Sequence, residues 1–135
     1  MKKIYIEYSI DGHDVVKEDV PTFDMLKSHL LEIREKTSET FASPFSVDVV
    51  IEGVGRISIG LADQTVLCFS SADLETMLTS VGDLSAVGDV VFYFGDYSIM
   101  SKKHVIPYAL GLSILEHWTS TGELGDMAKW THDLF

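Results

Sequence analysis

The side chains that could do acid–base or metal chemistry are spread along the sequence without a recognisable spacing. The histidines are His13, His29, His104, His117 and His132. No two of them have the His-Glu-x-x-His spacing of a zinc site, and there is no paired-cysteine, calcium-loop or glycine-rich phosphate-loop pattern. Asp11, His13 and Asp14 offer metal-binding atoms, but aspartates in such a turn more often bond their own backbone. We therefore predict no metal site and no cofactor.

Nucleophilic and general acid–base catalysis also find no support in the residue pattern. Cys68 is the only cysteine, and it lies in the apolar run 65–69. A buried thiol behaves as a small hydrophobic group, whereas a catalytic one needs a nearby base and an electropositive setting. Asp96 with Glu116 or Glu123 would be an acid–base pair only if the fold brought them within reach of each other. We predict that the chain is not an enzyme.

The charge of the chain says more about its partners. Ten Lys and Arg stand against 21 Asp and Glu in 135 residues, which gives a formal net charge of −11. No Lys or Arg occurs between Arg56 and Lys102. The carboxylates in that stretch are Asp63, Asp73, Glu75, Asp83, Asp89 and Asp96. Such a surface repels nucleic-acid phosphates and anionic membranes and speeds encounter with a basic protein, although acidity also simply keeps a protein soluble.

Hydrophobic periodicity predicts one α+β domain over residues 1–135. Helical spacing covers about 22–38, with Thr22 as the candidate N-cap, and about 107–121, between Pro107 and Gly122. Apolar runs predict about 6–8 short strands, at 3–10, 15–16, 47–51, 57–61, 66–69, 77–81, 89–94 and 127–131. Because the run 89–94 is apolar on both faces, we expect it to be a central strand. Consecutive strands with a helix near each end predict a largely antiparallel sheet on which both helices pack.

Several short segments of the second half occur in a recognisable order. They are Arg56-Ile57-Ser58-Ile59-Gly60-Leu61, Thr79-Ser80-Val81-Gly82-Asp83, Val90-Val91-Phe92-Tyr93-Phe94-Gly95, Val105-Ile106-Pro107, Trp118, Thr121-Gly122 and Trp130. This order resembles the first-numbered family of immunity proteins in bacterial polymorphic toxin and contact-dependent growth inhibition systems. The resemblance runs from about Arg56 to Trp130. The family often carries a proline in the turn after the helix, where this chain has Glu123-Leu124-Gly125-Asp126.

The resemblance implies a structural motif and a function. The motif residues are Gly60, Gly95, Pro107, Trp118, Gly122 and Trp130. We expect both tryptophans to pack in the core. The implied function is that of a cytoplasmic immunity protein, which binds the C-terminal domain of a cognate toxin and occludes its basic active-site cleft. Toxins paired with that family are frequently nucleic-acid deaminases, and nucleases also occur.

The candidate toxin contacts are loop residues with acidic or aromatic side chains. They are Asp63, Asp83, Asp96, Tyr97, Glu123 and Asp126. We expect no direct nucleic-acid partner, no membrane association, and a monomer or weak dimer when the chain is free. An N-terminus without the apolar block of a secretory signal favours the cytoplasm. Three alternatives stay open: an acidic nucleic-acid mimic that inhibits a DNA-binding protein, a small hydrolase that uses His104 or His117, and an oligomerising scaffold.

Overall fold

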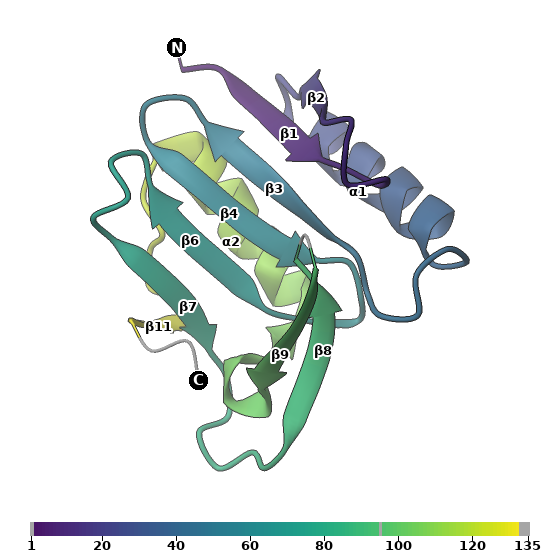
Figure 1. The fold of residues 1–135 in the computed structure, drawn as a ribbon. Coiled ribbons are helices and arrows are strands. Elements are labelled where there is room, and N and C mark those ends of the chain that lie inside the picture. The colour runs from purple at the N-terminus through teal and green to yellow at the C-terminus, as the bar shows by residue number, and fades with distance from the viewer. Residues whose placement is uncertain (1, 95, 133–135) are drawn as a thin grey trace.

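The structure, a computed structural model, describes residues 2–94 and 96–132. It is an α+β fold whose main sheet has seven antiparallel strands in the order β11-β7-β6-β4-β3-β1-β2 (Figure 1). The elements are β1 (Ile4–Tyr8), β2 (Val16–Asp19), α1 (Phe23–Thr37), β3 (Ser46–Ile51), β4 (Gly55–Gly60), β5 (Gln64–Thr65), β6 (Leu67–Ser71), β7 (Met77–Val81), β8 (Asp89–Tyr93), β9 (Tyr97–Ser101), the 3₁₀ turn η1 (Lys102–His104), β10 (Ile106–Pro107), α2 (Tyr108–Thr121) and β11 (Lys129–Thr131).

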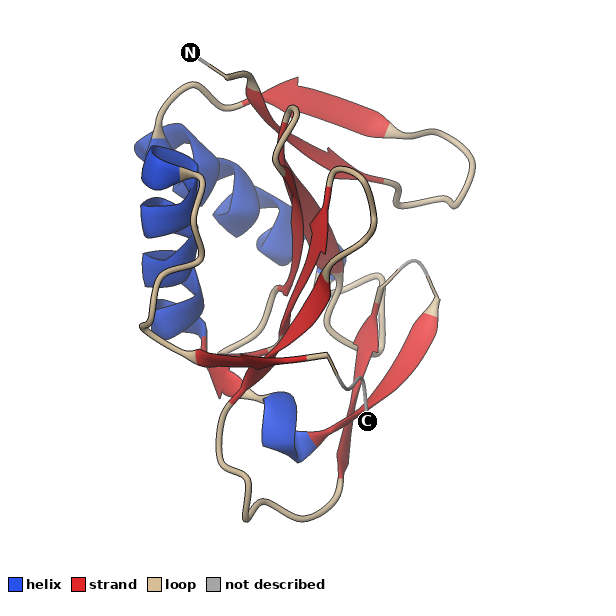
Figure 2. Cartoon of the chain, turned by 90° about the vertical axis from the view of Figure 1, so that its left-hand side faces the viewer, coloured by secondary structure: helices blue, strands red, loops and turns tan. Residues whose placement is uncertain are grey.

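Both helices cover the same face of the main sheet, and the β8–β9 hairpin lies on the opposite side (Figure 2). The predicted antiparallel sheet with two helices on it is confirmed. Most sheet neighbours follow each other in sequence and form simple hairpins. Two pairings join strands that a helix separates in the chain: β1 pairs with β3 as well as with β2, and β11 pairs with β7. Helix α1 connects β2 to β3 and crosses the sheet on its covered face.

The ends of the two helices follow from their capping residues. Thr22 has an extended backbone, and its Oγ1 accepts a hydrogen bond from the N–H of Met25 at 3.2 Å, so α1 begins where the sequence predicts. Helix α2 starts at Tyr108 because Pro107 is its extended N-cap residue and pairs with Gln64. Gly122 ends α2 in the left-handed conformation, at φ 78°, as the predicted stop requires.

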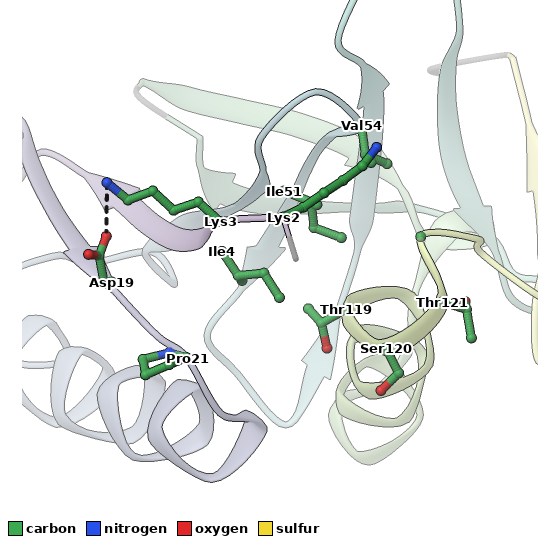
Figure 3. A pocket seen from close by; sticks show the side chains of 11 residues that line it. Lys2, Lys3, Ile4, Asp19, Pro21, Ile51, Val54, Thr119, Ser120 and Thr121 are labelled. Atoms are coloured by element: carbon green, nitrogen blue, oxygen red, sulfur yellow. Dashed lines mark ion pairs between the residues drawn. The ribbon is translucent and has the colours of Figure 1, made fainter.

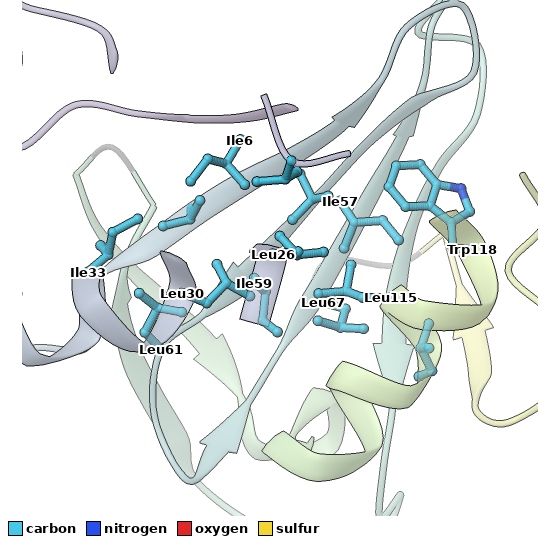
Figure 4. Packing of buried hydrophobic residues seen from close by; sticks show 14 of the residues in the cluster. Ile6, Leu26, Leu30, Ile33, Ile57, Ile59, Leu61, Leu67, Leu115 and Trp118 are labelled. Atoms are coloured by element: carbon cyan, nitrogen blue, oxygen red, sulfur yellow. The ribbon is translucent and has the colours of Figure 1, made fainter. Parts of the chain in front are cut away.

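The core fills the space between the sheet and the helices (Figure 4). Alternate residues of the central strands point to this side, among them Ile57 and Ile59 of β4, both 0% exposed. Trp118 of α2 is also 0% exposed, and the ring of Phe69 meets it edge-on at 6.1 Å between ring centroids. The prediction that Trp118 lies in the core is confirmed. Trp130 of β11 is only partly buried and packs against the border of the same cluster.

Strand β8 is not central, so that prediction was wrong. It forms a separate two-stranded sheet with β9, a strand that the sequence analysis did not predict. Phe92 and Met100 of this hairpin point towards the main sheet and pack with Val66. Val91 and Ile99 point away from it and are exposed. The apolar run 89–94 therefore has one packed face and one open face, and it is not buried on both sides.

The motif residue Gly60 makes room for the hairpin. A Cβ added to Gly60 would lie 2.5 Å from two ring carbons of Phe92, which is itself buried. Glycine is therefore needed at this position because an aromatic ring takes the place of its side chain. The other glycine that the motif assigns to this region, Gly95, lies outside the described residues.

Gly60→Ala should lower the free energy of unfolding by about 1–3 kcal/mol, because the added methyl group overpacks against Phe92. Urea denaturation followed by circular dichroism measures the loss. The same substitution in a Phe92→Leu background is the control, since the smaller side chain leaves space for the methyl group. An equal loss in both backgrounds would contradict the contact.

Candidate binding surface

The β8–β9 hairpin gathers half of the candidate contact residues. Asp83 lies in the loop that leads from β7 into β8, and Asp96 and Tyr97 lie where the chain enters β9. All three side chains are exposed. From the sequence we expected these residues in separate loops. In the structure they lie at the two ends of the β8–β9 hairpin.

The other three candidates lie elsewhere on the molecule. Asp63 is between β4 and β5, where its carboxylate pairs with the guanidinium of Arg34 on α1 at 2.8 Å. This places Asp63 on the side of the sheet that the helices cover. Glu123 and Asp126 are exposed in the connection from α2 to β11. A single interface of ordinary size centred on the hairpin does not need these three residues.

Apolar side chains gather on the outer surface of the hairpin and are exposed. Val91 and Ile99 face each other across the two strands, at 40% and 60% exposure, and Tyr97 is 63% exposed. We call Val91, Tyr97 and Ile99 the hairpin face. Leu84 and Val87, in the loop before β8, are also exposed. Apolar groups that gather on a surface in this way mark sites of protein interaction.

Tyr97 is held in place by a row of aromatic rings that starts in the core. Phe45 is 4% exposed and contacts Phe41 at 5.1 Å between ring centroids. Phe41 in turn contacts Tyr93 at 4.8 Å, and Tyr93 meets Tyr97 edge-on at 5.6 Å. Edge-to-face aromatic pairs are favourable, so they restrict the Tyr97 ring before any partner arrives. A restricted aromatic side chain loses little entropy on binding.

Carboxylates lie at both ends of the hairpin, with Asp96 in the turn and Asp83 and Asp89 at the other end. Asp83, Asp89 and Asp96 are all exposed. The Oγ and N–H of Ser85 donate to the Asp83 carboxylate at 2.6 and 2.9 Å, and these hydrogen bonds hold the pKa of Asp83 below its usual value. Asp83 is therefore ionised at neutral pH. The hairpin combines an ordered aromatic ring with fixed negative charge.

A second polar cluster lies on the face of the sheet opposite the helices. Arg56 of β4 pairs with Asp48 of β3 at 2.8 Å and lies 3.9 Å from Glu7 of β1. Ser58 donates its hydroxyl hydrogen to the other carboxylate oxygen of Asp48. The carboxylate of Asp48 is therefore bonded on both oxygens, and the carboxylate of Glu7 also lies 3.9 Å from Lys17. This is a paired network that neutralises itself, and it offers no free base or nucleophile.

A groove of about 870 Å³ opens between the start of β1 and the end of α2 (Figure 3). Its cation Lys3 pairs with Asp19 at 3.5 Å. The hydroxyls of Thr119 and Ser120 on its other wall donate to carbonyls of their own helix, at 2.8 and 2.9 Å. These side chains are thus already engaged, and Lys2, which also lines the groove, is an exposed cation. The lining brings together no set of groups for catalysis.

Comparison with known proteins does not assign the chain. No known protein family matches its sequence. No curated protein matches it either. In the described residues, no helix is long and apolar enough to cross a membrane.

Asp11, in the turn that offered metal-binding atoms, bonds nearby backbone groups, and His104 lies in the interior. No group of three or more His, Cys, Asp or Glu side chains in residues 2–94 and 96–132 could hold an ion. The carboxylate of Asp11 accepts the N–H groups of Asp14 and His13, each at 2.8 Å, and these bonds lower its pKa. His104 is buried, with Nδ1 3.0 Å from the carbonyl oxygen of Ser80. Nothing in the sequence pattern indicated that His104 would be buried.

The sequence contained only weak signals for strand β9 and for the aromatic contacts that order Tyr97. The five residues of β9 alternate between polar and apolar types except at Met100, and a Gly-Asp pair precedes them. That pattern is typical of a short hairpin. The contact between Phe41 and Tyr93 joins residues far apart in the chain, and no local pattern predicts such a pair.

Cys68 should react slowly in the folded protein. Burial raises the pKa of its thiol from 9.0 to about 11, and this lowers the thiolate fraction at neutral pH roughly 100-fold. We expect a chromogenic disulfide reagent to label Cys68 at least that much more slowly in buffer than in denaturing urea. Equal rates in the two conditions would mean that the thiol is open to solvent and would reopen a reactive role for it.

Proposed function

We propose that this chain is an immunity protein that binds the C-terminal domain of a cognate toxin and blocks its active-site cleft. The observation that carries the proposal is the hairpin face, which contains an ordered and exposed aromatic side chain and has carboxylates at both ends of the hairpin. It lies in the stretch between Arg56 and Lys102 that contains no Lys or Arg. The order of motif residues in the sequence supports the same function.

Inhibition would follow from occlusion. A toxin domain that acts on DNA or RNA needs a basic cleft to hold phosphate groups. The carboxylates around the hairpin attract such a cleft and compete with phosphate for its cations, and Tyr97 supplies the apolar anchor. Stable inhibitor interfaces bury about 800 Å² on each partner, so surface next to the hairpin would also take part. Because the toxin would act on nucleic acid inside the cell, the proposal places this chain in the cytoplasm.

Co-expression tests the proposal. The gene beside the one for this chain is expected to encode a large secreted protein with a toxin domain at its C-terminus. Cells that make this toxin domain should die alone and survive when the chain is also made. The purified chain should inhibit the purified toxin in equal amounts and should turn over no substrate itself. Failure to protect, or a catalytic activity of the chain alone, would overturn the proposal, and binding to an unrelated DNA-binding protein would favour a nucleic-acid mimic.

A further inference from the structure

The edges of the main sheet and of the β8–β9 hairpin differ in how they are protected. Strand β2, at one edge of the main sheet, carries the charged run Lys17-Glu18-Asp19, and β11, at the other, has only three residues. Charges and short length are the usual devices that stop an edge from pairing with another chain. Strand β9 has the sequence Tyr-Ser-Ile-Met-Ser and contains neither charge nor proline. It lies outermost on the side of the molecule away from the helices (Figure 2).

The hydrogen bonds of the hairpin show which groups of β9 point to its open edge. Lys102 donates its N–H to the carbonyl of Gly88, and Phe94 donates to that of Asp96, both at 3.0 Å. Bonded pairs alternate along an antiparallel ladder, so Ser98 and Met100 bond to β8. The N–H groups of Tyr97, Ile99 and Ser101 therefore point the other way, and no described residue accepts a hydrogen bond from them.

The opposite edge of the hairpin is already bonded at the end of β8. Tyr93 of β8 donates its N–H to the carbonyl of Pro44 at 2.8 Å, and its own carbonyl accepts from the hydroxyl of Ser46 at 2.7 Å. The β8 edge is therefore engaged at Tyr93, whereas none of the outward N–H groups of the β9 edge has a hydrogen-bond partner among the described residues.

We propose that a second copy of this chain pairs with that edge, β9 against β9, antiparallel and centred on Ile99. The N–H of Ile99 would donate to the carbonyl of Ile99 in the second copy, and the N–H of Ser101 to that of Tyr97. Tyr97, Ile99 and Ser101 all direct their N–H and C=O groups to the open edge, so the strands can form hydrogen bonds in this register. The two hairpins together form one four-stranded sheet, and their hairpin faces become continuous. This pairing does not depend on the identity of any toxin.

Charge favours a second copy over a strand from a basic partner. The β9 strand has an aspartate before it, Asp96, and the lysines Lys102 and Lys103 after it. Pairing about Ile99 places Asp96 opposite Lys102 of the second copy, twice by symmetry. Both side chains are exposed, and neither forms an ion pair with another described residue. A uniformly basic strand would instead be repelled at the lysine end.

Sedimentation equilibrium over a wide concentration range tests the pairing. The unmodified chain should show a monomer–dimer equilibrium. Asp96→Lys alone and Lys102→Asp alone should each weaken the dimer roughly tenfold, because each places like charges opposite each other at two positions. The double variant Asp96→Lys/Lys102→Asp should restore the affinity, since it exchanges the two charges and keeps the net charge.

Asp89→Lys is the matched control. It makes the same change in net charge on an exposed hairpin residue that faces Ser101 of its own β9 strand. A smaller negative charge weakens repulsion between copies, so Asp89→Lys should not weaken the dimer. If net charge alone governed association, Asp96→Lys would strengthen the dimer, and that result would overturn the proposed register.

Ile99→Pro tests the backbone contact. The N–H of Ile99 points away from β8, so proline there removes a bond between copies and none within the hairpin. Dimerisation should fall at least 100-fold while the circular dichroism spectrum is kept. If Ile99→Pro does not fold, dimerisation of the double variant Asp96→Lys/Lys102→Asp tests the pairing instead. A chain that stays monomeric at the highest concentration it tolerates, or a double variant that is not restored, would show that no second copy occupies this edge.

Discussion

Trp118→Ala should remove about 3–5 kcal/mol from the free energy of unfolding, the largest stability loss that we expect from a single substitution in this chain. The indole is fully buried between α2 and the sheet, and it lies against the ring of Phe69. Domains of this size are stable by only about 5–15 kcal/mol. The variant should therefore unfold at much lower urea concentration and should accumulate poorly in cells.

The two tryptophans of the motif provide the matched comparison. Trp130 is partly exposed at the edge strand β11, so Trp130→Ala should cost distinctly less than Trp118→Ala. Trp118→Phe should recover part of the loss because it refills part of the cavity. Both measurements use urea denaturation followed by circular dichroism. Equal losses at positions 118 and 130 would mean that the helix α2 face is not the centre of the core.

Local sequence signals predicted the helices well because the residues that start, pattern and end a helix lie within or next to the helical segment. The cap at Thr22, the apolar spacing of Leu26, Leu30 and Ile33, and the stop at Gly122 all act within a few residues of the backbone that they shape. The alternation of apolar residues in β3 and β4 likewise showed which side chains face the core.

The position of β8 could not be predicted in the same way. An apolar strand needs a covered face, but its sequence does not say which element covers it. In this fold the main sheet covers Phe92 at Gly60. The ring of Phe92 has space there only because Gly60 has no side chain. The two positions are far apart in the chain. The apolar pattern therefore predicted the strand correctly but did not indicate which sheet it joins.

The candidate binding surface was also only partly predictable from the sequence. Asp83, Asp96 and Tyr97 stood out from their loops because of charge or aromatic character. No local pattern joined them to Val91 and Ile99, because strand β9 was not predicted and cross-strand neighbours depend on the register of the two strands. The stack that orders Tyr97 needs Phe41, which lies in the connection from α1 to β3.

Tyr97→Ala should weaken the complex with the toxin by about 2–4 kcal/mol, a loss of affinity of roughly 30-fold or more. The ring is the most exposed member of the hairpin face, and Tyr93 orders it before binding, so truncation removes contact area that costs little entropy to use. Surface plasmon resonance should show the change mainly as faster dissociation. Tyr97→Phe should keep most of the affinity, because the ring and its contact with Tyr93 remain.

Charge reversal should change the association rate constant and not the dissociation rate constant. Asp83→Lys combined with Asp89→Lys should slow association with a basic toxin, and the effect should shrink as salt is added, whereas the effect of Tyr97→Ala should change little with salt. Met25→Ala on α1, at 42% exposure, is the control for truncation of an exposed apolar side chain away from the hairpin. An affinity that is unchanged by Tyr97→Ala but reduced by Met25→Ala would move the interface to the helical face. Association rates that do not respond to the charge reversals would remove electrostatic attraction from the mechanism and leave only the apolar contact.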